Sequence, residues 1–174
     1  MTTVEDFTKH RISEEGTYRA FPVAWTIEKA DSGAVAIAFK LGIWARWHGK
    51  EHGWSEQYAT GWFVENRTWV VKKDGTLNEG AIKNLQACGL WDGDWDKLEG
   101  AVPSIFVLVD VEKEEYEGRE QFRGNWINAD AAEPKPRGQF APVDKGLLQQ
   151  LRAKHQSKTR AIAGGSAPTG TPPA

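Results

Sequence analysis

The stretch that decides the fold runs from Ala34 to Trp69 and reads AVAIAFKLGIWARWHGKEHGWSEQYATGWFVENRTW. Apolar residues alternate along its first half, at Val35, Ile37, Phe39, Leu41 and Ile43. A period of two is typical of a β-strand that turns one face toward a core. We therefore expect a strand over residues 34–48, a connecting loop over 48–53 and a second strand over 54–64, with a turn at Asn66 and Arg67.

The positions between these apolar residues predict an outer surface that is aromatic and basic. Five of the nine Trp residues of the chain fall in this stretch. Single-stranded nucleic acids need flat surfaces for their bases and cations for their phosphates. We expect Trp44, Tyr58 and Trp62 to stack on bases. The full predicted nucleic-acid-binding set is Lys40, Trp44, Arg46, Trp47, Tyr58, Trp62, Lys72, Lys73, Arg119 and Arg123. The alternative for each Trp is burial in the core or at its rim.

The segments on either side of this stretch add three strands and one helix. Alternation predicts strands over residues 16–28 and 105–111, and a turn at 116–119 leads into a strand over 119–128. Leu77, Ala81, Leu85 and Cys88 recur at helical spacing, and Thr76 with Glu79 forms a candidate capping box. The expected fold class is mainly β with one helix. It is a five-stranded OB-like barrel with the helix between strands three and four.

Composition divides the chain into four expected segments. Residues 1–15 form an N-terminal lead-in, and residues 16–130 form the OB-like barrel domain. Residues 131–143 are a Pro-rich linker. Residues 144–174 combine a basic short helix, expected over about 144–156, with a flexible tail that has too few apolar residues to fold alone.

Charge is distributed unevenly along the chain. Residues 1–133 hold 15 Lys and Arg against 23 Asp and Glu, whereas residues 134–174 hold seven Lys and Arg against one acidic residue. An acidic body argues against nucleic-acid binding, because phosphate contacts supply most non-specific affinity. Residues 34–73 are the exception, with six basic and three acidic residues. A local basic face can still attract phosphate, since salt screens charges beyond about 8 Å.

Three segments resemble a family of small phage-encoded single-stranded-DNA-binding proteins. They are EEGTYRAFPVAWTIEKADSGAVAIAFKLGI, GAIKNLQACGL and VLVDVEKEEYEGREQFRGNWIN, and the resemblance covers roughly residues 14–130. The resemblance implies an OB-fold and a role on single-stranded DNA in phage replication or recombination. Bacterial single-stranded-DNA-binding proteins end in an acidic tail that recruits partners. The tail of this chain is basic and then neutral, so that mode of recruitment is not expected.

Two short motifs suggest metal chemistry but lack its context. His48-Gly49-Lys50-Glu51-His52 matches an inverted zinc-protease motif, which needs both imidazoles on one helix. Here two glycines flank a short loop. Asp92, Asp94 and Asp96 have the spacing that opens a calcium loop, but the Gly and Glu that complete such a loop are missing. We predict no enzyme, no cofactor and no metal site.

The remaining features indicate a soluble cytoplasmic protein. The chain lacks any apolar run of about 18 residues and any apolar signal region, and Cys88 is its only cysteine. The expected partner is single-stranded DNA, without a membrane. RNA, self-association and replication or recombination proteins remain open as further partners. Two other functions also remain open: a protein-interaction module or DNA mimic, and, less favoured, a carbohydrate-binding β-sandwich.

Overall fold

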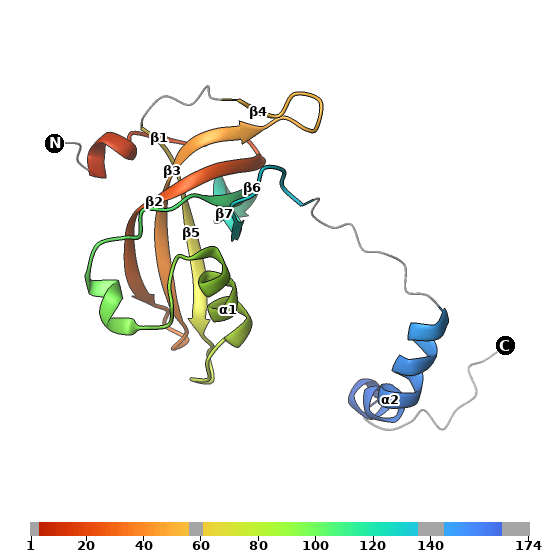
Figure 1. The fold of residues 1–174 in the computed structure, drawn as a ribbon. Coiled ribbons are helices and arrows are strands. Elements are labelled where there is room, and N and C mark those ends of the chain that lie inside the picture. The colour runs from red at the N-terminus through yellow and green to blue at the C-terminus, as the bar shows by residue number, and fades with distance from the viewer. Residues whose placement is uncertain (1–3, 56–60, 136–144, 165–174) are drawn as a thin grey trace. The chain divides into compact units, whose positions relative to one another are not determined.

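The structure is a computed structural model that describes residues 4–55, 61–135 and 145–164 (Figure 1). It contains two compact units, residues 1–135 and residues 136–174. The elements of the first unit are η1 (Val4–Phe7), β1 (His10–Arg11), β2 (Gly16–Lys29), β3 (Val35–Trp47), β4 (Trp54–Ser55), β5 (Trp62–Val71), α1 (Glu79–Cys88), η2 (Trp95–Glu99), β6 (Val107–Tyr116) and β7 (Arg119–Ala129). The second unit contains α2 (Lys145–Gly164).

All seven strands belong to one sheet, in the order β1-β5-β3-β2-β6-β7, with β4 paired to β3. Every pairing is antiparallel except that of β1 with β5. The expected mainly β class is therefore confirmed. The expected fold class counted one helix, whereas the described residues form two α-helices, α1 and α2. No ladder joins β5 to β7 within the described ranges, so the sheet is not closed and a barrel is not confirmed.

The alternation along β3 sets the core as expected. Ile37, Phe39, Leu41 and Ile43 are all buried, whereas Val35 at the start of the strand is only half-buried. Residues from β2, β5, β6 and α1 complete the same core. Phe39 pairs with Trp25 on β2 and with Asn66 on β5, so β3 lies in the middle of the three strands.

The expected turn at Asn66 and Arg67 is wrong, because both residues lie inside β5. Asn66 is 3% exposed, and its Nδ2 atom donates a 2.6 Å hydrogen bond to the Gly124 carbonyl oxygen. The turn preference of Asn reflects hydrogen bonds from its side chain to nearby backbone. Here Gly124 on the distant strand β7 supplies that acceptor, and pairing with β3 supplies the backbone hydrogen bonds of β5. The strand expected over 54–64 is likewise split into β4 and the start of β5, and residues 56–60 lie outside the described ranges.

Asn66 also joins two strands that share no ladder, since β5 and β7 lie against each other at this point. We expect Asn66→Ala to lower the free energy of unfolding by about 2 kcal/mol, because the buried Gly124 carbonyl loses its donor. Urea unfolding measures this change. Asn125→Ala is the matched control. Its Nδ2 atom donates a hydrogen bond to the Glu112 carboxylate within the β6–β7 hairpin. Removal of this amide should lower the free energy of unfolding by at most about 1 kcal/mol. Equal losses in the two variants would contradict the bridging role of Asn66.

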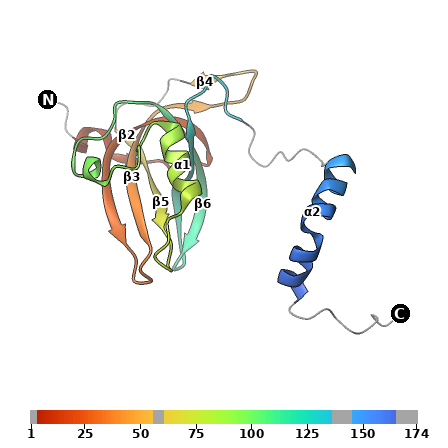
Figure 2. The same ribbon diagram turned by 60° about the horizontal axis from the view of Figure 1, so that its bottom comes forward.

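Helix α1 starts later than the sequence predicted. Its N-cap is Asn78, whose side chain accepts from the Ala81 amide, while Thr76 bonds the Asp74 carboxylate instead. Leu85 and Cys88 face the core. Figures 1 and 2 show α1 beside β5. Its Asn84 side chain donates to the Ile127 carbonyl of β7 at 2.8 Å, so α1 packs across both strands. Burial raises the pKa of the Cys88 thiol.

The second unit holds a longer helix than expected. α2 spans 20 residues, whereas the Leu spacing predicted a helix over about 144–156. Good helix formers such as Ala, Lys and Arg continue past that point, and they extend the helix although no apolar stripe requires it. None of the described helices is long and apolar enough to cross a membrane.

Candidate nucleic-acid interface

A groove of about 230 Å³ crosses the outer face of β2, β3 and β5. Its lining residues are Ala24, Trp25, Thr26, Glu28, Ala38, Phe39, Lys40, Glu65, Asn66, Arg67 and Arg123. Strand register explains this grouping. Lys40 pairs with Ala24 on one side and with Glu65 on the other, so these three side chains form one row. The next row is formed in the same way by Thr26, Ala38 and Arg67.

The groove is shallow because its floor is built from small side chains. Ala24 and Ala38 are half-buried and Thr26 is exposed, and these small side chains add little height above the backbone. The longer side chains of Lys40 on β3, Glu65 and Arg67 on β5, and Arg123 on β7 surround these small residues. A flat ligand can therefore lie on the sheet between charged walls.

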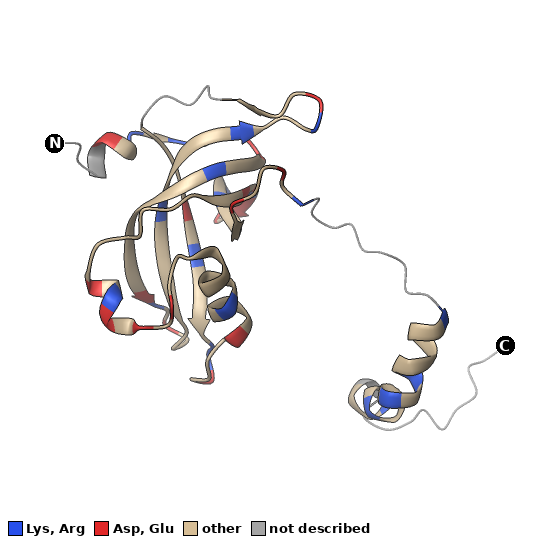
Figure 3. Cartoon of the chain, in the orientation of Figure 1, with Lys and Arg blue, Asp and Glu red and all other residues tan. Residues whose placement is uncertain are grey.

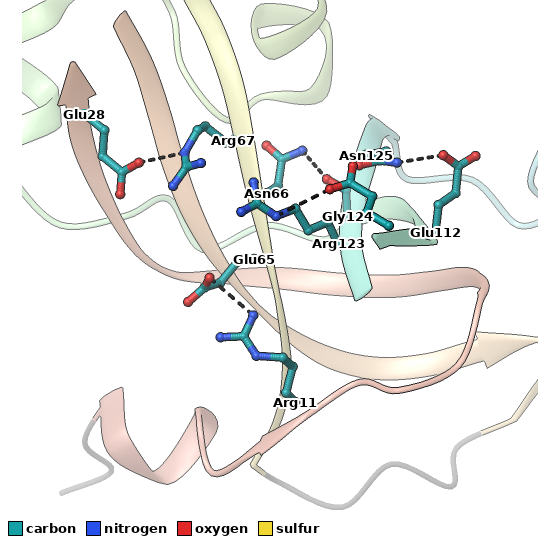
Figure 4. Close-up of polar contacts among 10 residues, drawn as sticks. Arg11, Glu28, Glu65, Asn66, Arg67, Glu112, Arg123, Gly124 and Asn125 are labelled. Carbon is teal, nitrogen blue, oxygen red and sulfur yellow. Dashed lines mark hydrogen bonds and ion pairs between the residues drawn. The ribbon is translucent and has the colours of Figure 1, made fainter. Parts of the chain in front are cut away.

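Three cations line the groove and differ in how firmly they are held; Figure 4 draws Arg67 and Arg123 with their surroundings. Arg67 Nε lies 2.7 Å from a Glu28 carboxylate oxygen, and Arg123 Nε lies 3.6 Å from a Glu114 oxygen. Lys40 is exposed and forms no ion pair within 4.0 Å among the described residues.

A fourth cation, Arg11, borders the same face. Its guanidinium lies 3.3 Å from Glu65, the carboxylate opposite Lys40, and 5.1 Å from the centre of the Phe63 ring. Figure 3 shows basic positions on β3, and acidic and basic positions close together on β5. The groove therefore holds cations whose charges are largely matched by neighbouring carboxylates.

Aromatic side chains gather on the outer face beyond Lys40. Trp44 is 53% exposed, and its ring lies 5.7 Å from that of Phe106, which in turn contacts Phe21. Gly42 allows this arrangement, since a Cβ atom there would lie 2.6 Å from the Phe21 ring. Phe21, Trp44 and Phe106 border an open notch of about 270 Å³ that is also lined by Ile105. We call these three rings the aromatic cluster.

Another exposed ring lies at the opposite end of the groove. Trp69 is 40% exposed and pairs with Ala36, two positions beyond the pairing of Arg67 with Ala38. Outward-facing positions along β3 and β5 thus run from the aromatic cluster through the cations to Trp69. The stretch of β3 from Trp44 to Ala36 spans roughly 26 Å at about 3.3 Å per residue.

Arg46 was predicted to contact phosphate, but the structure gives its guanidinium several partners within the protein. It forms an ion pair with Glu14, and its Nη2 donates a 2.9 Å hydrogen bond to the Glu15 carbonyl. It also lies over the Tyr18 ring at 5.8 Å. These contacts fasten the segment before β2 to the end of β3.

Trp47 likewise packs within the protein. Its ring lies 5.1 Å from that of Trp54. Trp54 is covered by the Arg19 guanidinium at 4.6 Å, and its Nε1 donates to the Ala132 carbonyl at 2.8 Å. This group of side chains holds the segment after β7 and lies outside the groove lining.

The expectation that Trp44 and Trp62 share one exposed face is wrong. Trp62 is half-buried, packs against the core cluster and lies 5.2 Å from the His10 ring. Its place follows from register: Gly42 pairs with Phe63, so Trp62 falls on the face that Val64 turns to the core. Tyr58, the third predicted stacking residue, lies outside the described residues.

The other predicted cations lie at the ends of strands rather than in the groove. Lys72 and Lys73 are exposed in the turn after β5. Arg119 is exposed at the start of β7 and pairs with Tyr116 across the hairpin turn. Of the ten predicted residues, the structure brings Lys40 and Arg123 into the groove and Trp44 onto the adjoining surface.

Sequence reasoning missed several residues of this face. Phe106 could have been found, because Ile105 and Val107 were expected to face the core and the residue between them must face outward. Arg67 was hidden by the expected turn. Phe21 was not singled out, because its place beside Gly42 depends on the register of β2 with β3, which shifts between Pro22 and Ala24.

Side chains of the two metal-like motifs contact neighbouring residues. His48 begins the loop between β3 and β4, and its Nε2 lies 2.9 Å from Ser55 Oγ. Asp92 forms an ion pair with Lys97, whose ammonium group holds the pKa of that carboxyl below its usual value. Asp94 caps η2. Across the described part of the chain, no three His, Cys, Asp or Glu side chains are arranged to hold a metal ion.

No protein-family model matches this chain, and no curated protein matches it in sequence at a significant level.

Proposed function

We propose that this chain is a non-enzymatic, sequence-tolerant single-stranded-DNA-binding protein that acts in DNA replication or recombination. The observation that supports it most is the order of side chains on the outer face. Exposed Trp44 and Phe106 lie at one end, Lys40, Arg67 and Arg123 lie in the middle, and Trp69 lies at the other end. Bases need flat aromatic rings on which to stack, and the phosphates between them need cations, so this surface offers both kinds of contact.

The topology supports an OB-type arrangement for this surface. The long strands follow the order β5-β3-β2-β6-β7, with α1 between β5 and β6 in the chain. An OB-fold has five strands with its helix between the third and the fourth, and it binds ligands on strands two and three. Those strands correspond to β3 and β5 here. We propose that contact between β5 and β7 at Asn66 and Gly124 completes a partly open barrel.

The ion pairs of the groove are compatible with phosphate binding. Glu28, Glu65 and Glu114 must release their arginines before these can bind phosphate. Exposed ion pairs of this kind contribute only about 0–1 kcal/mol each, so their exchange costs little. The released carboxylates then repel the strand, which predicts modest affinity that falls steeply with salt.

A titration with oligo-dT tests the proposal. We expect binding to quench Trp fluorescence, because Trp44 and Trp69 lie on the proposed contact surface, and we expect the affinity to fall as salt rises. A chain that binds no oligo-dT at low salt, by either fluorescence or gel shift, would refute the proposal.

The salt dependence also tests Lys40 specifically. Each phosphate contact to a single strand contributes about 0.7 to the slope of log affinity against log salt. We expect Lys40→Gln to make that slope about 0.7 less steep. Lys83→Gln is the matched control: Lys83 is equally an exposed lysine, but it lies on α1, and its loss should leave the slope unchanged. The same slope in both variants would remove Lys40 from the interface.

A protein-interaction module is the second candidate. The β6–β7 hairpin favours it, because its exposed or half-buried acidic residues include Glu112, Glu114, Glu115, Glu117 and Glu120. A basic protein partner would bind this hairpin. In that case, pull-down of such a partner would accompany an absence of oligo-dT binding.

A further inference from the structure

Helix α2 is the most strongly basic element of the chain. Residues 145–164 contain five Lys and Arg and no Asp or Glu. Figure 3 shows basic residues along α2 without acidic ones. The described side chains of this helix, residues 145–162, are all exposed. Unlike the arginines of the groove, its cations have no carboxylate within the same helix to match their charge.

Polar and cationic side chains of α2 fall on one face. Lys145, Gln149, Arg152, Gln156 and Arg160 are separated by steps of four, three, four and four residues. Residues three or four apart lie on the same side of a helix. These five residues therefore form one continuous stripe, which we call the basic stripe. Over 15 residues at 1.5 Å each it is roughly 22 Å long.

The rest of the helix surface has a different character. Leu147, Leu148 and Leu151 are each 40–44% exposed and lie on a separate face. Lys154 and Lys158 border this apolar side rather than the basic stripe. The helix thus offers two pairs of cations in different surroundings, which makes the contribution of each pair separable.

The shape and chemistry of the basic stripe fit a phosphate backbone. Lysine and arginine offer only N–H donors, glutamine adds two more, and phosphate oxygens accept them. A straight row of donors suits a linear polyanion better than a compact acidic pocket. The charge distribution agrees: residues 1–135 have 16 basic and 23 acidic residues, whereas residues 136–174 have six basic and one acidic residue. Long-range attraction of a nucleic acid must therefore come from the second unit.

We propose that the basic stripe of α2 is a second phosphate-binding surface, which contacts the same DNA strand that the groove binds. The inference rests on the proposed function, because it assigns α2 to the same ligand. Side chains at the groove stack on bases and contact nearby phosphates, whereas α2 supplies positive charge that no carboxylate of the same helix balances. Two linked contacts on one strand raise the overall affinity, since the second contact forms within the same complex.

Two double variants of the full chain test this assignment. Arg152→Gln with Arg160→Gln removes two cations of the basic stripe, and Lys154→Gln with Lys158→Gln removes two cations outside it. Both variants lose equal charge and gain a good helix former. With a long oligo-dT, we expect the first pair to make the salt slope about 1.4 less steep, at about 0.7 for each phosphate contact. The second pair should leave the slope within about 0.3 of that of the unchanged protein.

The outcomes separate this inference from the proposed function. Equal slopes for the two double variants, or no change in either, would overturn the role of the basic stripe while oligo-dT binding itself persisted. Loss of binding in the stripe variant alone, with Trp44→Ala and Lys40→Gln unaffected, would support α2 and refute the groove. Circular dichroism of both variants checks that α2 remains helical.

Discussion

Replacing Trp44 by Ala is expected to weaken the binding of oligo-dT by roughly 5- to 150-fold. One base stacked on an aromatic side chain contributes about 1–3 kcal/mol, and each 1.4 kcal/mol is a tenfold change in affinity. Trp44 is half-exposed on the outer face of β3, next to Phe106 and beyond Lys40. The loss should appear as a larger dissociation constant for oligo-dT. The fluorescence quenching on binding should also shrink, because Trp44 is expected to report much of it.

Trp95→Ala is the matched control for this prediction. Trp95 is 40% exposed and contacts one neighbouring ring, that of Trp91, so its removal deletes a similar indole. It lies in η2, outside the groove lining. We expect oligo-dT affinity to change less than twofold in this variant. If the two Trp variants bind equally well, Trp44 is not a stacking residue and the proposed binding face is wrong.

Replacing Gly124 by Val is expected to lower the free energy of unfolding by about 3 kcal/mol. A Cβ atom at this position would lie 2.6 Å from Val109 Cγ2 and 3.5 Å from the Glu65 carbonyl oxygen. Forcing extra methyl groups into a packed core costs about 1–3 kcal/mol, and Val adds three carbons. The variant should also bind oligo-dT more weakly, because the neighbouring Arg123 lines the groove. Urea unfolding and the oligo-dT titration measure the two effects.

A double-mutant cycle checks the cause of this loss. Gly124→Ala and Val109→Ala should each destabilise the protein by about 2 kcal/mol, the first by overpacking and the second by leaving a cavity. Their combination should cost at least about 1 kcal/mol less than the sum, because each change relieves the other. Strict additivity would show that contact with Val109 is not what requires glycine. Gly100→Ala, where the nearest atom would be 3.5 Å away, should have little effect.

The candidate site was predicted in part, and the reasons differ from residue to residue. Lys40 and Trp44 could be placed outside because strict alternation on β3 leaves them no other side. Trp62 could not be placed, since its face depends on the register between β3 and β5. A slip of one residue in the register exchanges the two faces of a strand. The pairing of Gly42 with Phe63 decides that Trp62 faces the core and that Glu65 and Arg67 face the groove.

Ion pairing was outside the reach of sequence reasoning for a similar reason. Nothing near Arg46 or Arg123 in the sequence indicates that either cation is ion-paired. Their partners Glu14 and Glu114 come from other segments of the chain. Only the pairing of β6 with β7 brings Glu114 to Arg123, and only the path of the chain before β2 brings Glu14 to Arg46. The charge available to a ligand is therefore smaller than the count of basic residues suggests.

The sequence by itself determined the mainly β class, the core face of β3, the hairpin of β6 with β7 and the basic character of the C-terminal segment. These features rest on periodicity and composition, which act over a few neighbouring residues. The tertiary structure decided the course of β5 through Asn66, the packing of Trp62 against the core, and the meeting of Lys40, Arg67 and Arg123 in one groove. These features depend on which strands pair and in what register, and no local pattern contains that information.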